Sequence, residues 1–316
     1  MCFQASAGRA VQCTAMNGSE VPCALCGERD TTRLYTKFNW GIERCRRCGL
    51  IYANPRAPEE TIHARYSSEY FWNEYLPAVG APGGEYDLDY QDQRHAAMLA
   101  LIRRYSPRGR RMLEVGTGAG LFLKAAERAG WVTAGLELSS EGSAFARDRL
   151  KLDVRTERAE EMSFPAASFD VAVMFDVIEH LFDPVTVLEA TRRAVAPLGI
   201  VVVSTPNYDA LSRFVLGVDW AVLSPLEHVY YFTEPTLAAM LRKSGWDSVI
   251  TERRFAGWGV YETMNYRYTH APDNWRARRY ERVLRSFGGR LAPLVQSTGR
   301  ADAILGIAVN GPDRPL

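Results

Sequence analysis

Four cysteines near the start of the chain have the spacing of a metal site. One Cys-x-x-Cys-Gly turn lies at residues 23–27, and a second lies at residues 45–49. Two thiolate pairs with this C-x2-C-x18-C-x2-C spacing indicate tetrahedral zinc. The expected zinc ligands are Cys23, Cys26, Cys45 and Cys48. Because four thiolates fill the zinc coordination shell, this zinc would be structural and would bind no catalytic water.

A glycine-rich turn at residues 113–120, LEVGTGAG, lies between a strand-like run and a helix-like run. Glycines in this position let a ligand approach the backbone closely. Glu137 ends the next strand-like run, where its carboxylate can accept both hydroxyls of a ribose. Glu114 would repel a pyrophosphate, and the G-x-G-x-G spacing differs from the G-x-G-x-x-G of nicotinamide dinucleotide enzymes. A ligand with ribose, adenine and an ammonium group is S-adenosylmethionine.

Two of the five histidines follow strand-like runs and could act as a base. Methyl transfer from a sulfonium is an in-line displacement that needs positioning, and an oxygen or carbon nucleophile must also lose a proton. His228, in SPLEHVYYFT, is the first choice for this base, and His180, in FDVIEHLFDP, is the second. Tyr231 beside His228 would supply an aromatic wall. Alternatively, each histidine could cap the helix that follows it.

These residues require a sheet to bring them together. From residue 111 onward, strand-like and helix-like runs alternate, which predicts a parallel, doubly wound α/β sheet that binds its ligand at the carboxyl ends of the strands. The strand-like runs lie at 111–116, 131–138, 153–158, 169–175, 200–206, 247–255 and 303–309. The helix-like runs between them lie at 121–130, 141–152, 184–199 and 232–246. Aromatic residues at 66–72 could cover the ligand site or belong to the core.

Residues 111–250 resemble the class I S-adenosylmethionine-dependent methyltransferases. The resemblance rests on LEVGTGAG, GLELS, AEEMSFPAASFDVAVMFDVIEHLFDP and HVYYFTEPTLAAMLRKSGW, in this order. It implies a Rossmann-like, seven-stranded mixed sheet whose final strand is antiparallel. It also implies that the glycine loop holds the methionine end of the cofactor and that residues 159 and 160 flank its adenine. Arg158 stands where many relatives carry an aspartate that faces the adenine.

The expected cofactor-binding residues are those of the glycine loop, the second strand end and the adenine side. They are Glu114, Gly116, Gly118, Gly120, Glu137, Leu138, Ala159, Glu160 and Phe175.

The segment DVIEH resembles the E-x-x-E-H segment of ubiquinone-pathway O-methyltransferases, in which the matching residues are implicated in binding a divalent cation. Carried over to this chain, Asp176, Glu179 and His180 would hold Mg²⁺, which would acidify a substrate hydroxyl. The first position is Asp and not Glu, and many relatives with a Glu-His pair need no metal. A site without Mg²⁺ is therefore favoured.

Cysteine turns ahead of a methyltransferase-like core resemble bacterial enzymes that act on sugars, glycans or secondary metabolites. This favours methyl transfer to a hydroxyl of a small molecule. A deoxysugar C-methyltransferase is one alternative, although the additional C-terminal domain of those enzymes is missing here. An RNA-base methyltransferase is another, because the ribosomal-RNA guanine methyltransferases also carry a cysteine-rich module and because arginines gather at 44–47 and 251–290. A scaffold that binds cofactor without catalysis is the third.

Composition limits the class of protein. The chain has 316 residues, a formal net charge of +1, 47% hydrophobic residues and 24% charged residues, which is typical of a soluble globular protein and gives no charge-driven attraction to nucleic acid. No apolar run approaches the roughly 18 residues of a membrane span, no secretion signal is evident, and the cysteine usage suits the cytoplasm. The sequence leaves the oligomeric state open.

The chain divides into four expected parts. Residues 1–20 lack any periodic pattern and are expected to be disordered. A zinc ribbon at 21–54 and a helical cap at 55–107 would precede the methyltransferase domain at 108–316. An insertion at about 257–300 would interrupt that domain before its last strand.

Overall fold

A computed structural model describes residues 18–252 and 298–311, together with positions 275, 278, 279, 282, 295 and 297. Most of the segment expected to be disordered and most of the expected insertion lie outside these described residues. Within the described part of the chain, no helix combines the length and the apolar character of a membrane span.

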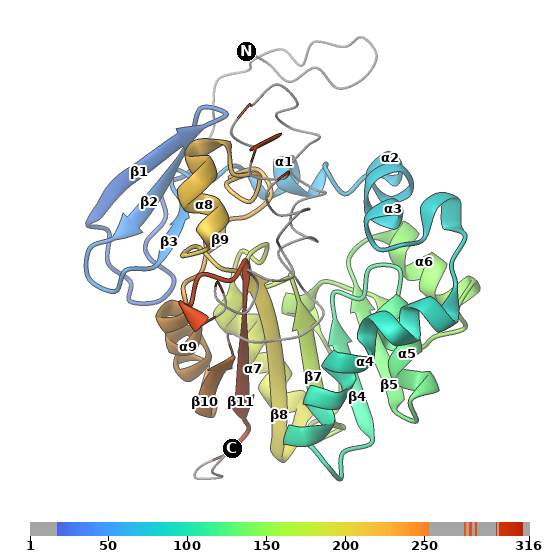
Figure 1. The fold of residues 1–316 in the computed structure, drawn as a ribbon. Helices are drawn as coiled ribbons and strands as arrows, with labels where there is room; N and C mark the ends of the chain where they lie inside the picture. The colour runs from blue at the N-terminus through green and yellow to red at the C-terminus, as the bar shows by residue number, and fades with distance from the viewer. Residues whose placement is uncertain are drawn as a thin grey trace.

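A seven-stranded mixed sheet forms the centre of the protein, which confirms the predicted fold (Figure 1). Its strand order is β10-β11-β8-β7-β4-β5-β6. Five neighbouring strands run parallel, whereas β11 is antiparallel to both β8 and β10. The strands are β4 (Arg111–Val115), β5 (Val132–Glu137), β6 (Val154–Thr156), β7 (Phe169–Phe175), β8 (Val195–Pro206), β10 (Asp247–Glu252) and β11 (Ala303–Val309).

Helices cover both faces of this sheet, and alternate residues of the strands form two separate cores. On one face, residues such as Met174 and Val203 pack with helices α7 and α9. On the other face, residues such as Val173 and Val202 pack with helices α4 and α5. Burial on both faces explains why the strands are nearly continuous apolar runs. The helices are α4 (Leu88–Tyr105), α5 (Leu121–Arg128), α6 (Ser140–Asp148), α7 (Pro184–Ala194), α8 (Leu211–Leu216) and α9 (Glu234–Lys243).

A second, four-stranded sheet combines the cysteine-bearing segment with a strand from far along the chain. Its order is β1-β2-β3-β9, and all of its pairs are antiparallel. The first three strands are β1 (Thr31–Lys37), β2 (Trp40–Cys45) and β3 (Ile51–Ala53), and the fourth is β9 (Tyr230–Tyr231). Cys23 and Cys45 also share a hydrophobic core with α7 and α9. The cysteine segment is therefore built into the larger fold.

Short helical turns connect the two sheets and lie near the glycine loop. They are α1 (Glu59–His63), α2 (Ser68–Tyr70), the π-helix η1 (Phe71–Tyr75), α3 (Leu76–Ala78) and the 3-10 helix η2 (Pro82–Gly84). Phe71 and Leu76 pack in a core with Leu121 of α5 and Phe145 of α6. Two further 3-10 helices are η3 (Ala159–Glu161) and η4 (Gly217–Asp219).

Candidate functional site

A cavity of about 490 Å³ lies at the carboxyl ends of strands β4, β5, β7 and β8. This volume is within the range of small-molecule sites, roughly 300–1,000 Å³. The cavity brings together most of the residues predicted from the sequence, namely Glu114, Gly116, Gly118, Glu137, Leu138, Ala159, Glu160, Phe175, His180 and His228. Gly120 and Tyr231 do not line it.

The glycines of this loop are required by the side chains that pack against them, whether or not a ligand is bound. Gly118 has a φ of 53°, and a Cβ atom there would overlap the hydroxyl of Tyr75. A Cβ atom at Gly116 would overlap the side chain of Val177. Gly120, the N-cap of α5, instead faces Ala146 of α6. Only glycine therefore lets this loop lie so close to the segments around it.

Glu137 is held by the backbone at the end of β5. Its Oε2 accepts a hydrogen bond from the amide of Gly118 at 2.6 Å, and its Oε1 accepts one from the amide of Ser139 at 2.8 Å. Burial raises the pKa of Glu137, while these amides act to lower it. Because a carboxylate offers about four acceptor positions, lone pairs of Glu137 remain for hydroxyl groups of a ligand, such as those of the ribose expected from the sequence.

Glu114 carries a buried carboxyl oxygen without a partner. The residue is 4% exposed, and among the described residues no donor reaches its Oε2. Burial, and next the charge of Glu137, raise the pKa of Glu114 well above its ordinary value. A buried carboxyl oxygen without a partner is costly, and a cationic ligand would remove this cost. The position therefore fits the ammonium group expected from the sequence.

His180 and His228 lie side by side in the lining of the same cavity. Their ring centroids are 4.6 Å apart, and the rings are nearly perpendicular. His228 Nδ1 is 2.9 Å from the carbonyl oxygen of Val222, and His180 Nδ1 is 2.9 Å from that of Glu227. Because a carbonyl can only accept, both rings carry their proton on Nδ1 and keep a lone pair on Nε2.

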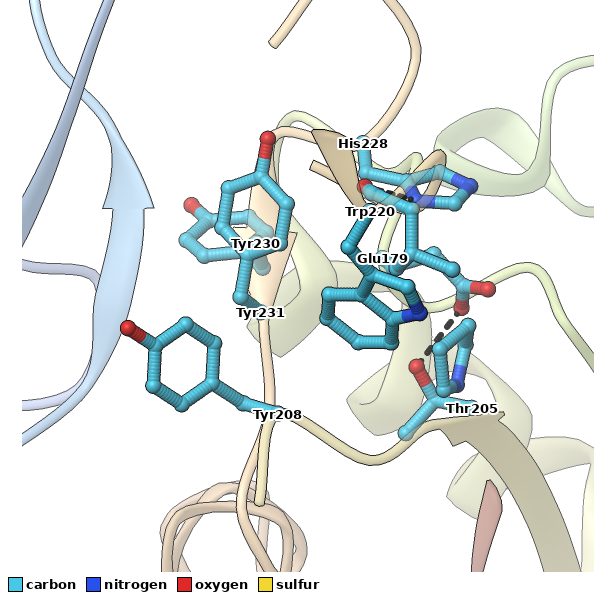
Figure 2. Close-up of a pocket in the computed structure, with 9 residues that line it drawn as sticks. Glu179, Thr205, Tyr208, Trp220, His228, Tyr230 and Tyr231 are labelled. Carbon is cyan, nitrogen blue, oxygen red and sulfur yellow. Dashed lines mark hydrogen bonds between the residues drawn. The ribbon is translucent and has the colours of Figure 1, made fainter. Parts of the chain in front are cut away.

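Both imidazoles are neutral in the free protein. Burial, and next the neighbouring His228, lower the pKa of His180 to about 3. Burial also lowers the pKa of His228 to about 4. Figure 2 shows His228 near Glu179, whose Oε2 accepts a hydrogen bond from Thr205 at 2.9 Å. Each histidine is therefore unprotonated at Nε2 at neutral pH and able to accept a proton.

The loop that carries His228 is fixed between two other segments. The carbonyl oxygen of Glu179 accepts hydrogen bonds from the amides of Val229, at 2.8 Å, and Tyr230, at 3.1 Å. On the other side, the amide of Ala53 donates to the carbonyl oxygen of Val229 at 2.9 Å. Tyr231 pairs with Ile51 in the four-stranded sheet and is buried outside the cavity. The structure thus places Tyr231 as a support of the loop, away from the ligand.

The three residues expected to hold Mg²⁺ do not form a cluster. Asp176 accepts a hydrogen bond from Ser204, whereas the potential ligands that lie close together in the cavity lining are Glu179, His180 and His228. Two imidazole nitrogens and one carboxylate are a poor match for Mg²⁺, which prefers oxygen ligands. The residues at this site therefore do not fit Mg²⁺.

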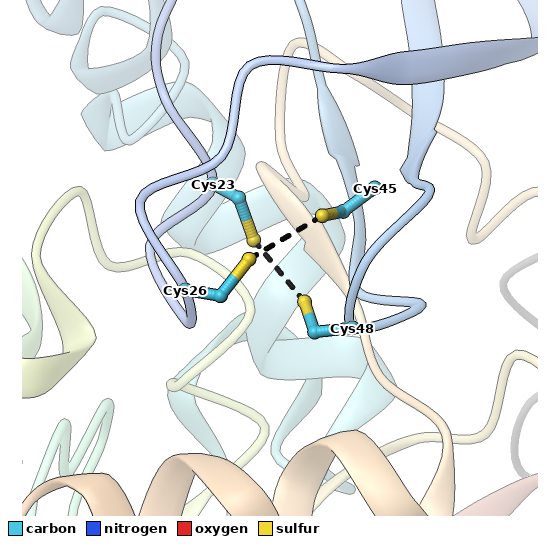
Figure 3. Close-up of side chains that lie close together, drawn as sticks. All are labelled: Cys23, Cys26, Cys45 and Cys48. Carbon is cyan, nitrogen blue, oxygen red and sulfur yellow. Dashed lines mark hydrogen bonds between the residues drawn. The ribbon is translucent and has the colours of Figure 1, made fainter.

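The four cysteine sulfurs converge as predicted (Figure 3). The Sγ atoms of Cys23 and Cys48 are 3.4 Å apart, and those of Cys26 and Cys45 are 3.5 Å apart. All four Sγ atoms lie within 4.8 Å of one another, and none forms a disulfide. Zinc–sulfur bonds of about 2.3 Å place tetrahedral thiolates about 3.8 Å apart, so the donor set fits zinc.

Three contacts near the cavity were not predicted from the sequence. Tyr75 reaches the glycine loop, where its Oη accepts a hydrogen bond from the amide of Ala119 at 3.3 Å. Tyr66 lies 3.0 Å, Oη to Nδ1, from His180. Arg158, which lines the cavity, forms an ion pair with Glu59 of α1 and so joins the cavity wall to the helical segment before the central sheet. None of these pairs has a local sequence signal, because each joins residues far apart in the chain.

The strand order and the cavity at the carboxyl ends of the strands define the class I S-adenosylmethionine-dependent methyltransferase fold. A family model described as a methyltransferase domain matches residues 90–251, just over half of the chain. The chain therefore belongs to this methyltransferase domain family.

Known proteins similar to the chain agree with this assignment. A ubiquinone biosynthesis O-methyltransferase of Cereibacter sphaeroides (strain ATCC 17025 / ATH 2.4.3) is 30% identical over 152 residues, which cover 45% of this chain and 62% of that protein. A ubiquinone biosynthesis O-methyltransferase of Xanthomonas axonopodis pv. citri is 31% identical over 154 residues, covering 45% and 64%. The chain thus spans less than two thirds of the length of these two relatives.

A solved structure shares the fold. It is an S-adenosylmethionine-dependent methyltransferase from Thermotoga maritima with 16% sequence identity and a TM-score of 0.50, and the match covers 79% of this chain and 99% of that one. At this identity the likeness concerns the fold alone.

Proposed function

We propose that the protein transfers a methyl group from S-adenosylmethionine to a hydroxyl of a small molecule, such as a sugar, a glycan precursor or a secondary metabolite. The observation that carries this proposal is a single cavity that Glu114, Glu137 and the His180–His228 pair all line. The names of the curated relatives, which are O-methyltransferases, support the hydroxyl acceptor.

The residues at the strand ends hold the cofactor in this proposal. S-adenosylmethionine supplies a methyl group that its sulfonium has already activated. Glu137 accepts the ribose hydroxyls, Glu114 pairs with the ammonium, and the adenine lies beside Leu138 and Ala159. Phe175 adds an apolar wall, held edge-on by Phe122 at 4.8 Å between ring centroids. The main contribution of these residues to the rate is the fixed orientation of the reacting groups.

His228 accepts the proton of the acceptor hydroxyl through its Nε2 atom, with His180 as the second candidate. The Nδ1 hydrogen bond to Val222 fixes the ring orientation and the tautomer. The carboxyl group of Glu179 lies 4.0 Å from His180 Nε2 and can stabilise the positive charge that proton transfer creates on the histidine pair.

The proposed acceptor class has a direct test. The protein is incubated with methyl-labelled S-adenosylmethionine and either sugars and phenols or total RNA, and the products are identified by mass spectrometry. We expect label in a small-molecule methyl ether and weak RNA binding with little salt dependence. Label in RNA bases, together with an affinity that falls steeply with salt, would establish the RNA-base alternative instead.

We also propose that the cysteine cluster holds one structural zinc ion. Cys26→Ser should remove the zinc, measured by mass spectrometry of the native protein, and lower the thermal unfolding midpoint by roughly 5 °C or more. Because β3 pairs with β9 beside His228, turnover should also fall while cofactor affinity stays within about twofold. Cys13→Ser is the control, since its spacing predicts no zinc ligand. Full zinc content in the Cys26→Ser protein would refute the assignment.

A further inference from the structure

The π-helix η1 places a tyrosine directly against the glycine loop. The wide turn of η1 is closed by the amide of Leu76, which donates to the carbonyl oxygen of Phe71. The Tyr75 ring stacks on Phe71, with centroids 5.7 Å apart and 19° between the planes, and Phe71 packs on Phe145 of α6. Single π-turns are frequent at functional sites. Tyr75 is the last residue of this π-turn.

The Tyr75 hydroxyl packs against two successive residues of the glycine loop, Gly118 and Ala119. Its oxygen accepts a hydrogen bond from the amide of Ala119, and the absence of a side chain at Gly118 makes room for it. The middle glycine of G-x-G-x-G is thus required by Tyr75, and Tyr75 lines the same cavity as Glu114 and Glu137.

The hydroxyl is available as a hydrogen-bond donor. Its oxygen already accepts from Ala119, and among the described residues its own hydrogen meets no acceptor. Burial, and next the charge of Glu137, raise the pKa of Tyr75, so the phenol keeps its proton at any physiological pH. A donor of this kind, facing a cavity, suits an anionic oxygen of the ligand.

We propose that Tyr75 donates a hydrogen bond to the carboxylate of the methionine part of S-adenosylmethionine. This inference rests on the proposed function. With the ammonium at Glu114 and the ribose at Glu137, the carboxylate, which is the one anionic group of the cofactor, lies over the glycine loop. Through Tyr75, the π-helix η1 becomes part of the cofactor site. The hydrogen bond also favours a cofactor that bears the carboxylate over one that lacks it.

The test compares two ligands that differ in this one group. Isothermal titration calorimetry measures the binding of S-adenosylmethionine and of decarboxylated S-adenosylmethionine, which keeps the ammonium, sulfonium and adenosine. Tyr75→Phe should weaken binding of S-adenosylmethionine about tenfold or more, which is typical for a lost hydrogen bond to a charged group. Its affinity for the decarboxylated ligand should stay within about twofold of the unmodified protein.

The controls separate this role from a structural one. Tyr86→Phe removes a hydroxyl whose partner is the carbonyl oxygen of Arg149, outside the cavity, and should change neither affinity. Equal weakening of both ligands in Tyr75→Phe would show that Tyr75 only supports the loop. No weakening would assign the carboxylate to another donor that lines the cavity, such as Arg94 of α4. Either result overturns the proposal. If the unmodified protein binds neither ligand, the proposed function itself fails.

Discussion

Replacing Glu137 by alanine is expected to raise the dissociation constant of S-adenosylmethionine by at least about 100-fold. Hydrogen bonds to a buried charged group contribute about 1.5–3 kcal/mol each, and the side chain would lose two ribose hydroxyls. The substitution also leaves the amide of Gly118 without its 2.6 Å partner, so the glycine loop loses part of its support. Isothermal titration calorimetry with S-adenosylmethionine measures the effect.

The control for this variant is Glu141→Ala. Glu141 lies in the first turn of α6, close to Glu137 in the chain, but it does not line the cavity. Its loss should leave the affinity within about twofold. If Glu137→Ala kept an affinity within threefold and melted at the same temperature as the unmodified protein, the ribose assignment would be wrong.

Much of the central sheet could be predicted because its signals are local. The run at 169–175 is buried on both faces, so it reads as a continuous apolar strand and becomes β7. The glycine loop and Glu137 follow the ends of β4 and β5, and parallel strands bring such ends to one edge of the sheet. The residues expected to bind the cofactor could therefore be predicted from the positions of the strand ends. The antiparallel last strand was implied by resemblance to a family.

The acceptor side and the join between the two sheets could not be predicted in this way. Strand β9 has two residues, too few for an alternating pattern. Its partner β3 lies far earlier in the chain, before the methyltransferase domain begins. Tyr231 stands beside His228 in the sequence, but this pairing directs it away from the cavity. Tyr75 and Gly118 meet through a π-turn that has no sequence signature.

The pairing of β3 with β9 changes the role that is expected for the cysteine segment. The sequence predicts a structural zinc ribbon that precedes the methyltransferase domain as a separate part of the chain. In the structure, Lys243 of α9 also donates to the carbonyl oxygens of Ala24 and Leu25 in the first cysteine turn. This contact ties the ribbon to α9, and the β3–β9 pair ties it to the loop that carries His228. Loss of zinc is therefore expected to disturb the residues around His228 before it disturbs those around Glu114 and Glu137.

Replacing His228 by glutamine is expected to lower kcat by about 100- to 1,000-fold, as is usual for the loss of a general base. The glutamine amide can still donate to the carbonyl oxygen of Val222, so the loop should keep its shape and cofactor affinity should stay within about twofold. Steady-state kinetics and calorimetry measure the two quantities. His180→Gln is the matched variant: if it lost the larger share of kcat, His180 would be the base, and if neither variant lost activity, no histidine base would be involved.

The pH dependence of kcat adds a test of the same base that needs no substitution. A histidine with an ordinary pKa near 6.5 becomes protonated below that pH, and a base of this kind loses activity between pH 7 and 5.5. Burial lowers the pKa of His228 to about 4 and that of His180 to about 3, so both rings remain unprotonated throughout this range. We therefore expect kcat to stay constant within about twofold from pH 7 down to pH 5.5. A tenfold fall over that interval would mean that the proton acceptor lies in a solvated environment, which the buried His180–His228 pair does not provide.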